Sequence, residues 1–304
     1  MQSLADKRVL ITGGSSGIGL ACAQRLGRAG ARTVLVARGQ EGLNDALSQV
    51  PNCVGVFAAD AGVPEQIGEA VRFAAERLDG IDVVVAAAAA LSYGPFMELS
   101  MEDYTRTISS TLLSGVNTTY AVLPELARSH GTLVIVASVA GRVPVPWLAA
   151  YSAAKHGLRG FTRALACELR ALDVPVRLAL VNPGPVDTPI WPRARTPDGR
   201  LPPLLDGPYR AADVAAEIEL AIRGRGPMER SVGGLMALWE RFDALLPNLS
   251  VRVTGTLAGL GWRNRDQHPR QESDGLTQPT TRARVSAGLR SRPSLLTKLR
   301  TITR

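Results

Sequence analysis

The chain has 304 residues, 45% of them apolar, which is enough to bury the core of a full-sized globular domain. No stretch of about 18 residues is apolar without charge or proline, and the N-terminus lacks a basic start followed by a long apolar core, so we expect neither a membrane span nor a secretory signal. The three cysteines, Cys22, Cys53 and Cys167, are far apart and form no metal-like pair. We therefore expect reduced thiols, a cytoplasmic location and no metal site.

The net charge of +8 is unevenly distributed along the chain. Residues 262–304 contain ten Lys or Arg against three Asp or Glu, so they carry seven of the eight positive charges. The tail, residues 263–304, is rich in Arg, Ser, Thr and Gln and poor in large apolar residues, a composition typical of a poorly ordered, solvated extension. It has no aromatic side chain that could stack on a base, so this reading is favoured over a nucleic-acid or membrane arm.

Strands and helices are predicted to alternate along residues 1–262. The expected strands are 7–13, 32–37, 53–60, 81–86, 131–138 and 174–184, with an edge strand at 228–234. The expected helices are 17–29, 41–50, 64–78, 101–128, 147–172, 211–223, 235–246 and 250–260. Alternation of this kind, with strands that are nearly continuous Val, Ile and Leu, predicts an α/β fold of the Rossmann type: a doubly wound parallel sheet with helices on both faces.

A long connection interrupts this alternation at residues 188–210, which are rich in Pro, Gly and Arg. A loop of that length in a compact domain usually acts as a lid or a binding loop. We expect it to contact the substrate.

A glycine-rich motif, TGGSSGIG at residues 12–19, lies between the first predicted strand and the first predicted helix. Glycines at Gly13, Gly17 and Gly19 allow a tight turn and let backbone N–H groups approach a phosphate at the helix N-terminus. The strand–turn–helix context makes this a strong dinucleotide-binding signal.

The residues after the second strand indicate which dinucleotide is bound. An acidic residue there would hold a ribose 2′-hydroxyl, whereas this chain has Ala37 followed by Arg38. A guanidinium can pair with a 2′-phosphate through charge-assisted hydrogen bonds, so we predict NADP(H) in preference to NAD(H). The alternative is an exposed Arg on an ordinary loop.

Three residues are typical of proton transfer. Ser138 ends a predicted strand, and Tyr151 and Lys155 are four residues apart, so they project from the same face of a helix. A neighbouring ammonium favours the phenolate and lowers the pKa of a tyrosine, as an acid/base near neutral pH requires. Ser138 can hydrogen-bond the substrate oxygen that Tyr151 protonates.

From residue 6 to about residue 190 the chain resembles the short-chain dehydrogenase/reductase family, in its single-domain form with a C-terminal helical extension. The motifs that carry the resemblance are residues 12–19, Asp60, Ser138, Tyr151, Lys155 and NPGPVDT at 182–188. The resemblance implies a seven-stranded Rossmann sheet and hydride transfer between a nicotinamide and a carbonyl or alcohol. It also implies that Asp60 contacts the adenine, Lys155 the nicotinamide ribose and residues 183–188 the carboxamide side. The residues expected to hold the cofactor are Gly13, Ser15, Ser16, Gly17, Ile18, Gly19, Arg38, Asp60, Ala61, Ala87, Ala88, Tyr151, Lys155, Pro183, Gly184, Val186 and Thr188.

The chain departs from the family pattern at two places. The family usually has Asn-Asn-Ala-Gly after the fourth strand, where this chain has alanine at all four positions from Ala86 to Ala89. The family's helix Asn, which holds a water in the proton relay, corresponds to Thr111. Its side chain is shorter than that of Asn. An alanine at position 89 is compatible only with a negative φ.

The favoured function is an NADP-dependent oxidoreductase that reduces a carbonyl, or oxidises the alcohol, of a small hydrophobic molecule. The two departures motivate an alternative, a non-redox epimerase, dehydratase or cyclase with the same fold. A third reading is a cofactor-sensing binding protein. Residues 91–96, 139–147 and 188–209 should form an apolar substrate pocket, and helices 235–260 could cap it, join an interface or touch a membrane. The family suggests a homodimer or homotetramer, and the scarcity of Lys, three of 35 basic residues, hints at a bacterial genome.

Overall fold

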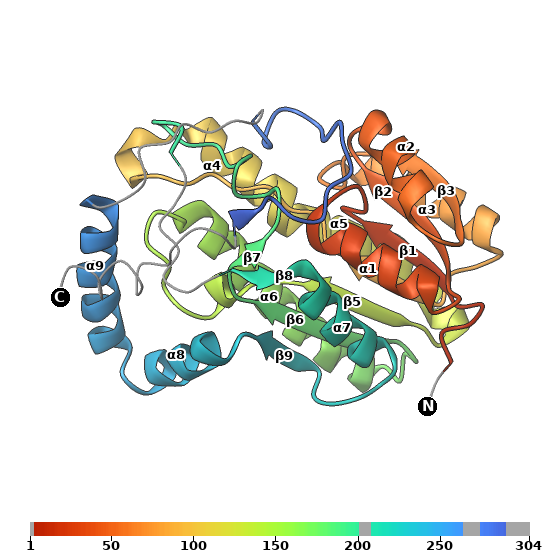
Figure 1. The fold of residues 1–304 in the computed structure, drawn as a ribbon. Helices are drawn as coiled ribbons and strands as arrows, with labels where there is room; N and C mark the ends of the chain where they lie inside the picture. The colour runs from red at the N-terminus through yellow and green to blue at the C-terminus, as the bar shows by residue number, and fades with distance from the viewer. Residues whose placement is uncertain (1–2, 201–207, 264–273, 290–304) are drawn as a thin grey trace.

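The computed structural model describes residues 3–200, 208–263 and 274–289 (Figure 1). A sheet of seven strands, all paired in parallel, forms its centre in the order β3-β2-β1-β4-β5-β6-β9. These strands are β1 (Arg8–Thr12), β2 (Arg32–Ala37), β3 (Cys53–Ala58), β4 (Val83–Ala86), β5 (Thr132–Val136), β6 (Arg177–Pro183) and β9 (Glu229–Val232). The predicted doubly wound Rossmann sheet is thereby confirmed. Its strand order reverses between β1 and β4, the place where such sheets bind ligands.

Helices cover both faces of the sheet, as the continuous apolar strands predict. They are α1 (Gly17–Arg28), α2 (Gln40–Gln49), α3 (Pro64–Leu78), α4 (Met101–Ile108), α5 (Ser114–Ser129), α6 (Ala149–Ala171), α7 (Ala211–Ile222), α8 (Gly234–Leu245) and α9 (Pro247–Arg263). Helices α1, α2 and α7 bury one apolar cluster, and α3, α5 and α6 bury a second one on the opposite face. Successive strand residues alternate between them, so that Val83 and Val85 pack in the first and Val84 in the second.

Two predicted helices differ in detail. The helix expected at 101–128 is divided into α4 and α5 by a π-helical turn, Ser109–Leu113, which contains Thr111. Such bulges are frequent at functional sites. The helix expected from Trp147 begins at Ala149 instead, because Trp147 has φ of +68° and cannot continue a right-handed helix.

The alanines after β4 form a small-residue wall at the carboxyl end of the sheet. Strand β4 ends at Ala86, and the next residues, 87–90, have no regular secondary structure. Ala89 is not among the residues with positive φ, so the backbone at this position is compatible with an alanine. Ala86 is therefore the last residue of β4, and residues 87–90 continue the chain without forming a helix.

The C-terminal part of the chain returns to the carboxyl edge of the sheet. The short parallel strands β7 (Val186–Asp187) and β8 (Tyr209–Arg210) pair at the two ends of the predicted substrate loop, and α8 and α9 follow β9. The basic tail was expected to be poorly ordered, yet its residues 274–289 pack against the domain, with Leu276, Ala283 and Leu289 buried. Residues 264–273 and 290–304 of that tail lie outside the described residues.

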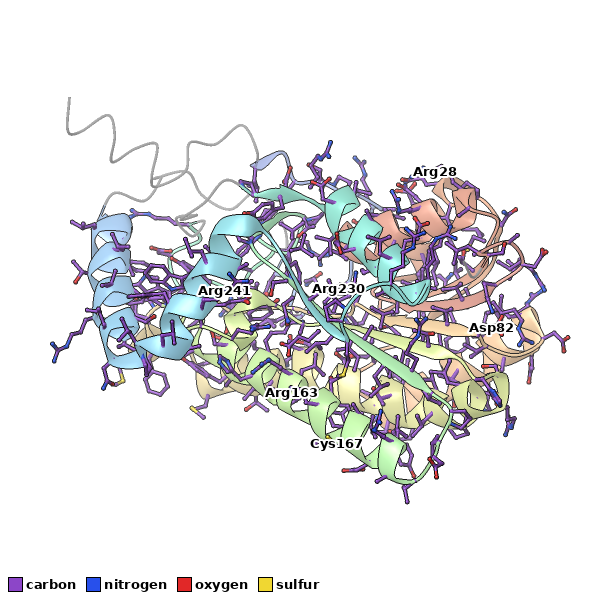
Figure 2. The ribbon with its side chains drawn as sticks, turned by 90° about the horizontal axis from the view of Figure 1, so that it is seen from below. Arg28, Asp82, Arg163, Cys167, Arg230 and Arg241 are labelled. Atoms are coloured by element: carbon purple, nitrogen blue, oxygen red, sulfur yellow. The ribbon has the colours of Figure 1, made fainter. Side chains whose placement is uncertain are left out.

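The three cysteines are free thiols, as expected: Cys22 is buried, Cys53 half-buried and Cys167 exposed. Figure 2 shows Cys167 with Arg163 on α6, which forms the lower face of that view. Within the described ranges, none of the helices is long and apolar enough to cross a membrane.

Candidate active site

A cavity of about 440 Å³ opens at the carboxyl ends of the strands, and a second one of about 90 Å³ adjoins it. Every residue expected to hold the cofactor or to transfer the proton lines one of the two. The smaller cavity is lined by Ser15, Asp60, Ala61 and Ala88. The larger one is lined by Gly17, Ile18, Gly19, Ala87, Ser138, Tyr151, Lys155, Pro183, Gly184, Val186 and Thr188. Both are lined by Gly13, Ser16 and Arg38. The fold therefore brings these residues together around two adjoining cavities, and their roles in binding and catalysis stay predictions.

The glycine-rich turn allows β1 to pass directly into α1. Gly13 has φ of +71°, and a Cβ placed on it would lie 2.9 Å from the backbone of Ala87. A Cβ on Gly19 would lie 2.3 Å from the carbonyl oxygen of Gly13. Because no side chain fits at these two positions, the turn places no side chain of its own in front of the helix N-terminus, which is suited to an anion. This cradle fits a dinucleotide pyrophosphate.

Arg38 and Asp60 lie at the ends of neighbouring strands. Arg38 follows β2, and its guanidinium donates to the backbone carbonyl groups of Gly275 and Leu276 in the C-terminal segment. Asp60 follows β3, and its Oδ1 accepts a hydrogen bond of 2.8 Å from the backbone of Gly62. Both residues line the smaller cavity, which is also bordered by small side chains from the alanine run.

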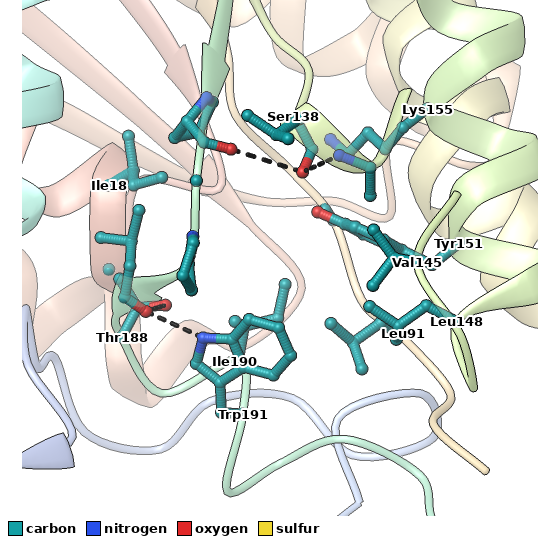
Figure 3. A pocket seen from close by; sticks show the side chains of 18 of the residues that line it. Ile18, Leu91, Ser138, Val145, Leu148, Tyr151, Lys155, Thr188, Ile190 and Trp191 are labelled. Atoms are coloured by element: carbon teal, nitrogen blue, oxygen red, sulfur yellow. Dashed lines mark hydrogen bonds between the residues drawn. The ribbon is translucent and has the colours of Figure 1, made fainter. Parts of the chain in front are cut away.

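Ser138 is held at the end of β5 by two backbone contacts. Its Oγ accepts a hydrogen bond of 3.1 Å from the backbone of Ala140 and lies 3.5 Å from the carbonyl oxygen of Pro183. Figure 3 shows its hydroxyl beside Tyr151 and Lys155, all three facing the cavity opposite Thr188 and Trp191.

Tyr151 and Lys155 project from one face of α6, as their spacing predicts. Lys155 is 2% exposed; its Nζ donates a hydrogen bond of 2.8 Å to the carbonyl oxygen of Val136 and lies 5.5 Å from the centre of the Tyr151 ring. Burial lowers the pKa of Lys155 to about 7. Burial also raises the pKa of Tyr151 well above its usual range, and a hydrogen bond with Ser138 offsets only part of that shift.

The pKa of Tyr151 thus moves in the opposite direction to the sequence-based expectation. The expectation considered only the charge of the nearby ammonium, whereas removal of the phenolate from water is the larger effect here. A tyrosine with a raised pKa is protonated at neutral pH. That is the form a proton donor needs.

Thr111 occupies a different role from the Asn of the usual relay. Its side chain is fully buried, and its Oγ1 donates a hydrogen bond of 2.8 Å to the carbonyl oxygen of Ala90. The hydroxyl therefore braces the end of the alanine run, and Lys155 contacts the backbone of Val136 instead.

The substrate side of the larger cavity is mostly apolar. Val143, Val145, Ile190 and Trp191 line it as predicted, whereas Trp147 packs beside it against Trp262, with ring centres 4.6 Å apart. Helices α8 and α9, which the sequence left as a possible cap, contribute Met236, Trp239, Thr254 and Leu257 to the lining. The apolar residues of helices 235–260 indicated this contribution, because an apolar helix face is stable only when it packs against another surface. Gly275 and Thr280 also line the cavity, and sequence reasoning did not name them. Nothing in the tail's composition signalled Gly275 or Thr280.

A glycine-rich strand–helix turn, a small recess lined by Arg38 and Asp60, and a Ser–Tyr–Lys set at the same sheet edge are the features of a nucleotide-dependent oxidoreductase. Comparison with known proteins agrees: residues 7–198 match the family model described as short chain dehydrogenase. The chain belongs to this family, whose members act on CH–OH and C=O groups with an NAD(P) cofactor.

Individual relatives support the assignment. A Streptomyces coelicolor protein that carries the name of a ketoacyl reductase is 37% identical over 188 residues, 60% of this chain and 71% of that protein. A hydroxysteroid 11-beta-dehydrogenase 1-like protein of Gallus gallus is 33% identical over 227 residues, 73% of this chain and 75% of that protein. The X-ray structure of an alcohol dehydrogenase from the archaeon Thermococcus sibiricus, complexed with 5-hydroxy-NADP, is similar with a TM-score of 0.64 and 25% identity, and covers 74% of this chain and 96% of that one.

Proposed function

We propose that the protein is an NADPH-dependent reductase of a hydrophobic ketone or aldehyde, also able to oxidise the corresponding alcohol. The observation that carries this proposal is the set of Ser138, Tyr151 and the buried Lys155, which lines the cavity at the boundary between the cofactor cradle and its apolar side. A small carbonyl compound is therefore the proposed substrate.

Each of the three polar residues has a separate role in the proposed proton transfer. When bound, NADPH supplies a hydride for the carbonyl carbon. The Tyr151 hydroxyl gives its proton to the carbonyl oxygen, and Ser138 holds that oxygen by a hydrogen bond. The nearby Lys155, when protonated, stabilises the phenolate that remains on Tyr151.

The preference for NADPH is supported by Arg38 and by the absence of an acidic residue beside it at the end of β2. A guanidinium can form charge-assisted hydrogen bonds with a 2′-phosphate, and the relative from Thermococcus sibiricus was determined with an NADP derivative. Lys155 would contact the nicotinamide ribose and Asp60 the adenine.

The substrate is proposed to be hydrophobic because its side of the cavity presents Val143, Val145, Ile190, Trp191 and Trp239. We also propose a homodimer or homotetramer in the cytoplasm. Large apolar side chains on α4 and α5 support the assembly, since Met101 is 72% and Tyr120 85% exposed.

A panel of aromatic and aliphatic ketones, tested with NADPH and NADH, examines the proposal directly. We expect NADPH oxidation matched by alcohol formation, and an Arg38→Gln variant whose kcat/KM falls about 10–100-fold with NADPH but little with NADH, because NADH has no 2′-phosphate for the guanidinium to bind. Product formed without any change in the cofactor's redox state would instead support the epimerase, dehydratase or cyclase. NADPH binding without any turnover would support a cofactor-sensing protein.

A further inference from the structure

The C-terminal strap, residues 274–289, crosses the adenosine end of the cofactor cradle. Figure 1 shows it in dark blue, running beside α1 and α2. The backbone N–H of Gly17, the first residue of α1, donates a hydrogen bond of 2.8 Å to the carbonyl oxygen of Arg284, and Ser16 pairs with Arg284 as an isolated parallel bridge. A helix N-terminus that is suited to a pyrophosphate therefore holds a carbonyl group of this chain.

Two arginines of the site are engaged by the same strap. Arg38 Nη1 donates a hydrogen bond of 3.0 Å to the carbonyl oxygen of Leu276, and Nη2 donates one to the carbonyl oxygen of Gly275. Arg193 Nη2 donates a hydrogen bond of 2.5 Å to the carbonyl oxygen of Gln278, and Nη1 donates one to the hydroxyl of Thr280. Backbone carbonyl groups thus occupy donors that a phosphate would need.

Specific contacts outside the cofactor cradle hold the strap in place. The carboxylate of Asp187 accepts hydrogen bonds of 2.6 Å from Ser286 Oγ, 3.0 Å from the backbone of Ala287 and 2.9 Å from that of Leu289. Asp45 on α2 accepts one of 2.8 Å from the backbone of Ala283. These contacts make the strap a docked element with its own binding groups.

The strap approaches α2 so closely that a glycine is required. A Cβ on Gly42 would lie 2.3 Å from the carbonyl oxygen of Thr280, and one on Gly39 would lie 2.5 Å from the same atom. Neither glycine has a positive φ, so backbone conformation alone does not require a glycine there. The space they leave is filled by the strap.

We propose that the strap is an autoinhibitory segment that NADP(H) must displace from the adenosine and pyrophosphate positions. The N–H of Gly17 has one hydrogen, which cannot serve a carbonyl oxygen and a phosphate oxygen at full strength together. The closed strap and the bound cofactor therefore compete for Gly17 and Arg38. The apparent affinity for the cofactor is reduced by the fraction of molecules in the open form, so release of the strap regulates the enzyme.

This inference depends on the proposed cofactor, and the test separates the two. The full-length Gly42→Ala variant keeps every cofactor contact and favours helix α2, but it clashes with the docked strap. Gly68→Ala in α3 is the matched control, because its added Cβ would meet only the flexible end of Arg72, at 3.8 Å. Ser286→Ala is a second variant, which weakens the strap at its far end.

NADPH titration by fluorescence or calorimetry measures the competition without requiring turnover. We expect Kd to fall about fivefold or more in Gly42→Ala, to fall in Ser286→Ala and to stay unchanged in Gly68→Ala. An unchanged or higher Kd in both strap variants would overturn the proposal. No NADPH binding by any variant would refute the cofactor assignment itself.

Limited trypsin digestion gives a second readout, because Arg282 and Arg284 are exposed residues of the strap. Displacement predicts that NADP+ accelerates cleavage after these residues, as identified by mass spectrometry. A strap that instead closes over the bound cofactor would be protected by NADP+, and that result would contradict autoinhibition.

Discussion

At the scale of single residues, burial decides how the active-site groups ionise. Tyr151 and Lys155 are both removed from water, and burial disfavours the charged form of each, which raises the pKa of the first and lowers that of the second. The sequence predicted that the two would share a helix face, because that depends only on their spacing. It could not predict the direction of the Tyr151 shift, because the depth of the cavity is set by α8, α9 and the substrate loop.

The lowered pKa of Lys155 makes folding stability depend on pH. Between about pH 7 and its ordinary value near 10, Lys155 binds a proton in the unfolded state but not in the folded one, so the free energy of unfolding rises with pH in that window. Below about pH 7 both states are protonated and the contribution is constant. From about pH 7 to about pH 9.5 the rise should be about 3 kcal/mol.

Urea unfolding of the wild type and of Lys155→Met at these two pH values isolates that contribution. We expect the wild type to gain stability relative to the variant as the pH rises. Equal pH dependence of the two proteins would show that Lys155 is not held in a desolvated site.

At the scale of secondary-structure elements, most of the sheet follows from the sequence, because buried parallel strands are short runs of Val, Ile and Leu closed by Gly, Pro or Asp. The exceptions have local causes. Trp147 delays the start of α6, and the π-helical turn around Thr111 depends on a tertiary hydrogen bond to Ala90 that a periodic pattern cannot reveal. The edge strand β9 is mostly polar, and side-chain contacts anchor it to its neighbours.

The principal anchor of β9 is Glu229. Its Oε1 accepts hydrogen bonds of 2.6 Å from Arg159, 2.9 Å from Arg142 and 3.1 Å from Asn182. Burial alone would raise the pKa of Glu229, but the hydrogen bond from Arg159 and the charges of both arginines outweigh it and hold the pKa below its usual range.

Glu229→Ala should therefore lower the free energy of unfolding by about 3 kcal/mol, because Arg159 loses its carboxylate partner and Arg142 keeps only Glu240. The control is Glu102→Ala on α4, where the pair with Arg106 is exposed and worth about 0.5 kcal/mol or less. Denaturant unfolding at neutral pH measures both. Similar losses in the two variants would show that the Glu229 cluster does not anchor the edge strand.

At the scale of the whole molecule, residues 274–289 of the basic tail were the least predictable of the described segments. Their low apolar content indicated a solvated tail, yet residues 274–289 dock through backbone groups on Asp187, Asp45 and Gly17. Backbone donors and acceptors are the same in every sequence, so composition contains no trace of such contacts. The strand that leads into the alanine run, by contrast, follows from its valines, and β4 ends at Ala86 as predicted.

The central claim is that Tyr151 donates the proton in an NADPH-dependent carbonyl reduction. Tyr151→Phe keeps the ring and removes only the hydroxyl, so its kcat can be compared with that of the wild type on a ketone found in the panel, with NADPH affinity measured in parallel. We predict a fall in kcat of about 10²–10⁴-fold with the Kd for NADPH changed by about twofold or less. Turnover at the wild-type rate in Tyr151→Phe would contradict the mechanism.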